Sequence, residues 1–232
     1  MLIDKATSEA ISANGWVSMP SDLAIQIPDY AKELGQLVPS YVEGEYVDHL
    51  ELKTAENAPR HSLSGMYGMG AFPFHTDYAH RRMPPRYVLL RSIGQSEKVR
   101  PTLLLDFNSI KLDPGQIDAL RRDVWIVNGG REKFLSTVLA GMTRVSVQFL
   151  RFDTACMRPA HSRFESSASI LRDAIAQASP MNHSWDSGEM LIFDNWRMLH
   201  ARPEEGDHID DGRILERSMA AYGSEEGDEL GI

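Results

Sequence analysis

The chain has 232 residues, a mass of 26.0 kDa and a formal net charge of −9, with 33 Asp and Glu against 24 Lys and Arg. A pI near 5.4 argues against a general surface for nucleic acids or anionic membranes. With one cysteine, Cys156, the chain forms no internal disulfide, and a cysteine-based zinc site is excluded.

The whole chain, 1–232, is expected to form a single domain, with an N-terminal helical part of about residues 1–45 packed on the rest. A chain of this length buries roughly 70% of its unfolded surface, and no repeat or linker marks an internal boundary. No segment approaches the roughly 20 apolar residues that span a bilayer. We therefore expect a cytoplasmic protein with no nucleic-acid or membrane partner; its oligomeric state is left open.

In chain order, helical spacing of apolar residues predicts helices over Ser21–Leu37, Asp113–Arg122 and about Arg163–Ala178. Short β-branched or aromatic runs followed by turn residues predict buried strands at Tyr87–Leu90, Thr102–Leu105, Val124–Val127, Val145–Phe149 and Met190–Phe193. Several short strands with few intervening helices favour a sandwich or jelly roll over a doubly wound fold. The expected fold is mainly β with flanking helices.

The first motif that indicates chemistry is Phe74-His75-Thr76-Asp77. In an extended segment, residues i and i+2 project to the same face, so His75 and Asp77 are placed to bind one ion. Two histidines and one carboxylate on one face leave positions open for Fe(II) oxygen chemistry. Taken alone, the motif is weak evidence for a metal site, and a turn that carries a surface carboxylate is the ordinary interpretation.

A third ligand, His200, follows the apolar run Met190–Phe193 and a polar turn. Farther along, Arg213 and Arg217 share one face of an expected strand. If these arginines are buried they require anions, which a dicarboxylate cosubstrate supplies. The alternative is a solvated face on which they pair with Glu216 or the acidic loop.

Three segments resemble the taurine dioxygenase and clavaminate-synthase-like group of Fe(II)/2-oxoglutarate oxygenases. They are Ser62–Tyr78 (SLSGMYGMGAFPFHTDY), Pro84–Leu90 (PPRYVLL) and Ser187–Arg202 (SGEMLIFDNWRMLHAR), followed by the Arg213 segment. The resemblance runs from about Ser62 to Tyr222. It implies a double-stranded β-helix, or jelly roll, that binds Fe(II) and uses 2-oxoglutarate and O2 as cosubstrates.

The resemblance also implies roles for individual residues. His75, Asp77 and His200 fall on the three iron ligands, and Arg213 on the arginine that holds the distal carboxylate of 2-oxoglutarate. Arg217 matches a second arginine that contacts either the cosubstrate or the prime substrate, and its role is left open.

Thr102 falls where the group often has a threonine near the cosubstrate. Val99-Arg100-Pro101 replaces the usual Gly-Gly pair before it, and a threonine is also simply a good strand residue.

The expected reaction is hydroxylation of a C–H bond in a small anionic or zwitterionic molecule, with release of succinate and CO2. Arg202, Arg217, Arg81 and Arg82 are the candidate anion-binding groups, although pairing with acidic residues is an alternative for each. The opposing functional hypothesis is a non-catalytic jelly-roll module, for binding or regulation, that retains the metal-site residues.

Overall fold

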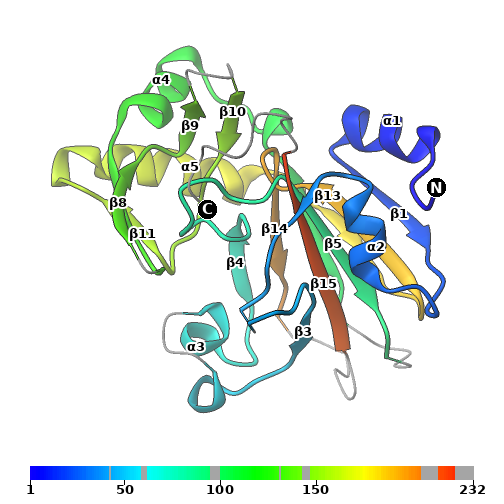
Figure 1. The fold of residues 1–232 in the computed structure, drawn as a ribbon. Helices are drawn as coiled ribbons and strands as arrows, with labels where there is room; N and C mark the ends of the chain where they lie inside the picture. The colour runs from blue at the N-terminus through cyan, green and yellow to red at the C-terminus, as the bar shows by residue number, and fades with distance from the viewer. Residues whose placement is uncertain are drawn as a thin grey trace.

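Two antiparallel sheets lie at the centre of the structure, a computed structural model that describes residues 1–41, 43–58, 62–94, 100–130, 132–142, 147–204 and 214–222 (Figure 1). The larger sheet has the order β1-β13-β5-β15-β2, with β3 also paired to β15, and the smaller has the order β12-β6-β14-β4. Their strands are β1 (Trp16–Pro20), β2 (Gln36–Leu37), β3 (Asp48–Glu51), β4 (Phe72–His75), β5 (Tyr87–Ser92), β6 (Thr102–Asp106), β12 (Met181–His183), β13 (Glu189–Asp194), β14 (Met198–Arg202) and β15 (Ile214–Ala221).

The two sheets pack face to face through the apolar side chains on their inner faces. Val88 and Leu90 of β5 point to the same side as Leu191 of β13, and meet Leu104 of β6 and Met198 of β14 in one buried cluster. Successive strand residues point to opposite faces, so the intervening residues, such as Leu89, belong to a different cluster. The central core therefore lies between the sheets.

Helices α1 (Lys5–Asn14) and α2 (Ile27–Lys32) cover the outer face of the larger sheet (Figure 1). The Asp4 side chain caps the start of α1 by accepting a hydrogen bond from a backbone N–H, and Gly15 ends the helix at φ 83°, a conformation that favours glycine.

The outer face of the smaller sheet carries a second group of elements. These are α4 (Pro114–Arg122), α5 (Glu165–Gln177), β7 (Trp125–Asn128), β8 (Lys133–Ser136), β9 (Leu139–Met142), β10 (Val147–Leu150) and β11 (Met157–Pro159). Leu120 of α4 and Leu171 of α5 are fully buried and share a cluster with Leu105 and Leu199 of that sheet. A short helix, α3 (Leu63–Tyr67), and three 3-10 turns (Ala55–Asn57, Phe107–Ser109 and Ser162–Phe164) complete the described secondary structure.

The prediction of a mainly β chain with flanking helices is confirmed, and the helices expected at Asp113–Arg122 and Arg163–Ala178 are present within two residues at their ends. The expected strands are present as β5, β6, β7, β10 and β13; residues 145 and 146 lie outside the described ranges. The long helix expected over Ser21–Leu37 is wrong. Only Ile27–Lys32 is helical, because Pro28 suits the first turn of a helix and the chain after it joins the sheet as β2.

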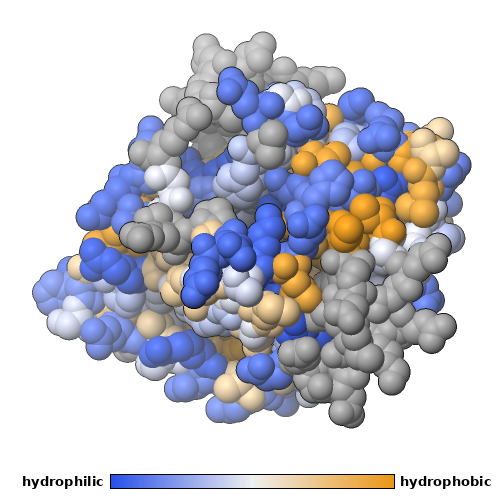
Figure 2. Space-filling model, turned by 90° about the horizontal axis from the view of Figure 1, so that it is seen from below, coloured by the Kyte–Doolittle hydropathy of each residue, from blue (hydrophilic) through white to orange (hydrophobic). Residues whose placement is uncertain are grey.

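None of the helices in the described ranges combines the length and apolar character needed to cross a membrane. The face seen in Figure 2 is largely hydrophilic, with hydrophobic side chains gathered toward one side.

The layer between the N-terminal helices and the larger sheet gives a first prediction. Ile192 of β13 is fully buried there. Ile192→Ala is expected to lower the free energy of unfolding by about 2 to 5 kcal/mol, because it removes buried methyl groups and leaves a cavity. Urea unfolding measures the change. The control, Leu135→Ala, alters a residue that is 67% exposed and should cost less than about 0.5 kcal/mol; equal losses would contradict this packing.

Candidate metal centre

Strand pairing brings His75 and His200 together. His75 ends β4 and lies directly opposite His200 of β14 in the antiparallel register. Opposed residues of such a pair project to the same side of the sheet, and the two imidazole rings have their centroids 4.1 Å apart. The His75 Nδ1 lies 2.9 Å from the Pro73 carbonyl oxygen, which can only accept, so Nδ1 carries the proton and Nε2 is free to bind a metal.

Asp77 lies in the turn after β4, and Asn195 fixes that turn. The Asp77 N–H donates to Asn195 Oδ1 at 2.7 Å, while Asn195 Nδ2 donates to the carbonyl oxygens of Asp77 and Pro85. Thr76 donates its N–H to the Phe152 carbonyl oxygen at 2.7 Å. The backbone on both sides of the carboxylate is thus anchored to distant segments.

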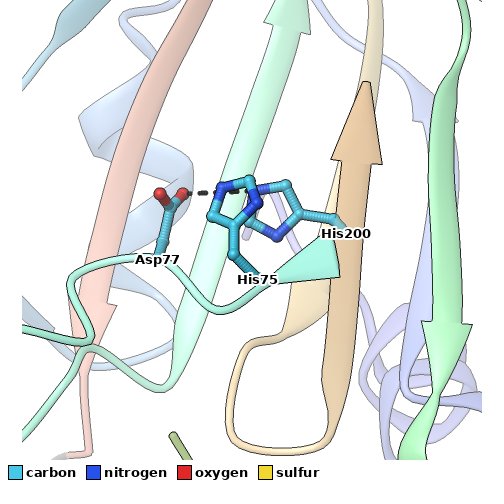
Figure 3. A group of neighbouring side chains, drawn as sticks. All are labelled: His75, Asp77 and His200. Atoms are coloured by element: carbon cyan, nitrogen blue, oxygen red, sulfur yellow. Dashed lines mark ion pairs between the residues drawn. The ribbon is translucent and has the colours of Figure 1, made fainter. Parts of the chain in front are cut away.

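The three candidate ligands converge on one point, as Figure 3 shows. Their ligand atoms all lie within 4.8 Å of one another, and Asp77 Oδ2 is 3.8 Å from His200 Nε2. All three residues are buried, and Asp77 Oδ2 accepts no hydrogen bond. A buried carboxylate oxygen without a donor is costly unless a cation approaches it, so two imidazoles and this oxygen fit a divalent metal of the Fe(II) type.

Electrostatics keep His200 and Asp77 ready for a cation. Burial, together with the neighbouring His75, lowers the pKa of His200 to about 3, so its imidazole is neutral at pH 7. Burial alone would raise the pKa of Asp77, but Arg217 and the two histidines outweigh it and the pKa is lowered. A neutral imidazole and an ionised carboxylate are the forms that bind metal.

Arg217 lies at the same site, and its partners are carboxylates of the protein. Its Nη1 donates to Asp77 Oδ1 at 2.8 Å, and its Nε and Nη2 donate to Asp48 Oδ2 at 3.2 and 2.9 Å. Burial would lower the pKa of Arg217, but these two carboxylates raise it well above its usual value. The sequence left Arg217 open between a bound anion and acidic residues of the protein, and it did not indicate Asp48, which follows no recognisable motif.

Thr102 and Arg213 are the other two expected cosubstrate residues. Thr102 of β6 is buried, and its Oγ1 accepts a hydrogen bond from Trp185 Nε1 at 3.1 Å. Arg213 lies outside the described residues.

A cavity of about 740 Å³ opens above the three ligands. Its walls include the ligands with Tyr41, Asp48, Tyr78, His80, Thr102, Arg202 and Arg217. Arg202 donates to the carbonyl oxygens of Gly68 and Gly70 and lies over the Phe72 ring. The cavity therefore has polar and aromatic walls next to the metal-type donor set.

Arg81 and Arg82, the other candidate anion-binding residues, have their own partners. Arg81 donates to the Pro39 carbonyl oxygen and lies over the Tyr78 ring, while Arg82 pairs with Glu132.

Two further residues near the motifs contribute to the site. Trp196, in the turn before His200, packs with its Nε1 donating to the Pro84 carbonyl oxygen. His80 lines the cavity and stacks on Tyr78 with ring centroids 5.3 Å apart. The sequence pattern did not indicate the hydrogen bonds from Asn195 to Asp77 or the place of His80 on the cavity wall.

Comparison with solved structures identifies the fold. No family model matches the chain, and no curated protein matches its sequence. Among solved structures, an asparagine oxygenase in complex with Fe(II), 2S,3S-3-hydroxyasparagine and succinate is similar, with a TM-score of 0.70 and 19% identity over 93% of this chain and 77% of that one.

Two more solved structures are similar at low identity. PvcB from Pseudomonas aeruginosa has a TM-score of 0.67 and 16% identity over 93% of this chain and 79% of its own. A taurine dioxygenase from Burkholderia xenovorans has a TM-score of 0.69 and 14% identity over 95% of this chain and 83% of its own. The chain therefore shares the fold of oxygenases that include the taurine dioxygenase type, as the sequence resemblance implied.

The lowered pKa of His200 predicts how the metal-free protein responds to acid. The unfolded chain binds a proton at this imidazole below its ordinary pKa of 6.5, whereas the folded protein does so only near pH 3. The free energy of unfolding should therefore fall as the pH drops from 6.5 toward 3, by about 2 kcal/mol from His200 alone at pH 5.

Urea unfolding of wild type and His200→Gln at pH 7 and pH 5 measures this contribution. Burial also lowers the pKa of His80 and His183, so both proteins keep part of the acid sensitivity. The wild type should lose about 2 kcal/mol more than the variant, and an identical pH dependence in the two proteins would show that His200 is not held neutral.

Proposed function

We propose that this protein is an Fe(II)- and 2-oxoglutarate-dependent dioxygenase that hydroxylates a C–H bond of a small anionic or zwitterionic molecule and releases succinate and CO2. The observation that carries the proposal is the buried set of His75, Asp77 and His200, with a carboxylate oxygen that accepts no hydrogen bond, at the base of a cavity. The fold shared with iron oxygenases supports it.

The proposal includes the architecture. We take the two facing antiparallel sheets to be a double-stranded β-helix, or jelly roll, and residues 1–232 to be one domain. The packing of α1 and α2 on the larger sheet supports the placement of the N-terminal part on this core.

The residues have distinct tasks in this proposal. His75, Asp77 and His200 hold Fe(II), which together with 2-oxoglutarate and O2 supplies an oxidant able to attack a C–H bond. Asn195 and Thr76 keep the Asp77 turn in place. The buried surroundings limit the access of water to the site, and so protect a reactive oxidant from side reactions.

The cosubstrate residues follow the sequence resemblance. Arg213, immediately before β15, is proposed to hold the distal carboxylate of 2-oxoglutarate as a bidentate partner. Thr102 is proposed to lie beside the cosubstrate, and its position on the cavity wall supports this.

An amino acid is the class of prime substrate that we propose. Solved structures with this fold contain hydroxyasparagine and hydroxyarginine, both zwitterionic amino acids. Arg202, Arg217 and Asp48 line the cavity. Arg217 and Asp48 pair with each other, so a zwitterionic substrate would share these groups with the protein's own ion pair.

The alternative is a non-catalytic binding or regulatory module. Such a module has no need for three buried ligands that converge on one point at a cavity, so the observations favour the enzyme. Turnover without a prime substrate distinguishes the two functions.

The decisive experiment tests the metal and the turnover. Anaerobic addition of Fe(II) and 2-oxoglutarate should produce a weak visible absorption band, and admission of air should produce slow release of succinate. His200→Ala should abolish both, because one of three protein ligands is lost, while circular dichroism shows an intact fold. The control His161→Ala alters an exposed histidine outside the cavity and should behave as wild type. Binding of Fe(II) without any succinate would favour the module.

A second experiment tests the cosubstrate arginine. Arg213→Ala should raise the 2-oxoglutarate concentration needed for half-maximal succinate release by roughly 30-fold or more, because a charged bidentate pair worth about 2 kcal/mol is lost. Arg158→Ala, an exposed arginine of β11, is the matched control and should leave this concentration unchanged. A larger rise in Arg217→Ala than in Arg213→Ala would reverse the assignment.

A further inference from the structure

Two carboxylates share one buried guanidinium beside the metal-type donors. Arg217 of β15 lies directly opposite Asp48 of β3 in the antiparallel register, and Asp77 reaches it from the turn after β4. All three side chains are about nine-tenths buried. Each of the three therefore depends on the others for its charge balance.

The pairing makes the two oxygens of Asp77 unequal. Oδ1 accepts from Arg217 Nη1 at 2.8 Å, whereas Oδ2 accepts no hydrogen bond and points toward the histidines, 3.8 Å from His200 Nε2. As long as Arg217 keeps this position, Asp77 offers one oxygen to a cation. The other coordination positions are then left for cosubstrates.

Asp48 is what holds Arg217 in that position. Its Oδ2 accepts from both Nε and Nη2 of Arg217, which fixes the plane of the guanidinium, and its Oδ1 accepts from the Tyr41 N–H at 3.4 Å. The Asp48 charge also balances Arg217, whose positive charge would otherwise oppose a cation at Asp77.

We propose that Asp48 is a positioning residue for the metal: it holds Arg217 so that Asp77 presents a single oxygen, Oδ2, to the ion. The inference rests on the metal site of the proposed function. Asp48 acts through Arg217 and Asp77 and does not contact the ion.

A matched ion pair on the same strand provides the control. Glu216, the neighbour of Arg217 on β15, pairs with the buried Arg91 at 2.5 Å. Neighbouring strand residues point to opposite faces, so this pair lies away from the metal-type donors. Glu216→Gln thus removes a carboxylate from a buried arginine without disturbing the site.

The test compares Mn(II) binding by Asp48→Asn and Glu216→Gln in the metal-free full-length protein. Electron paramagnetic resonance of free Mn(II) measures the dissociation constant, and thermal unfolding of the metal-free proteins measures stability. We expect Asp48→Asn to raise the dissociation constant about 10- to 100-fold, with Glu216→Gln within about twofold of wild type. Asp48→Glu, which keeps the charge, should recover part of the affinity.

Two results would overturn the proposal: wild-type Mn(II) affinity in Asp48→Asn, or equal losses of affinity in both variants. If Asp48→Asn does not fold, a crystal structure of the wild-type Mn(II) complex decides. Asp77 should bind through Oδ2 alone, with Oδ1 still on Arg217, and coordination through both oxygens would refute the inference. Succinate release by wild type tests the proposed function separately, since the Mn(II) comparison does not depend on turnover.

Discussion

Backbone pairing between β4 and β14 is the constraint on which the site depends. It places His75 opposite His200, although more than half of the chain lies between them, and it leaves Asp77 just past the end of β4. The short turn alone would not direct Asp77 inward. Asn195, which precedes β14, binds both the N–H and the carbonyl oxygen of Asp77, so the segment that supplies the second histidine also fixes the carboxylate. Two strands and one amide side chain thus determine the geometry of all three ligands.

Burial of charge is the second constraint on the geometry of the site. Asp77, Arg217 and Asp48 form a row of alternating sign within the fold, and each would be destabilising alone. The row carries a net negative charge, which suits a site intended for a cation. Arg217 therefore serves the protein's own carboxylates first, and an anionic ligand would have to share the guanidinium with them.

Much of this could be predicted from the sequence because it depends on local pattern. The i, i+2 spacing of His75 and Asp77 and the apolar strand before His200 indicated the ligand set, and short apolar runs such as Met190–Phe193 indicated the strands. Asp48 could not be found in this way, since its role comes from the register of β3 on β15, a pairing between segments far apart in sequence. The helix expected over Ser21–Leu37 failed for a related reason: hydrophobic spacing does not reveal that β2 will be needed at the edge of the larger sheet.

The separation of the ligands along the chain has a consequence for biosynthesis. His75 and Asp77 leave the ribosome long before His200, and the strand that carries His200 pairs with β6 and β4, both of which precede it. Pairings between distant segments form late, because closing a long loop costs entropy before any contact is gained. A nascent chain thus presents only one histidine and one carboxylate of the donor set. The full set of three donors exists only once the fold that encloses it is nearly complete.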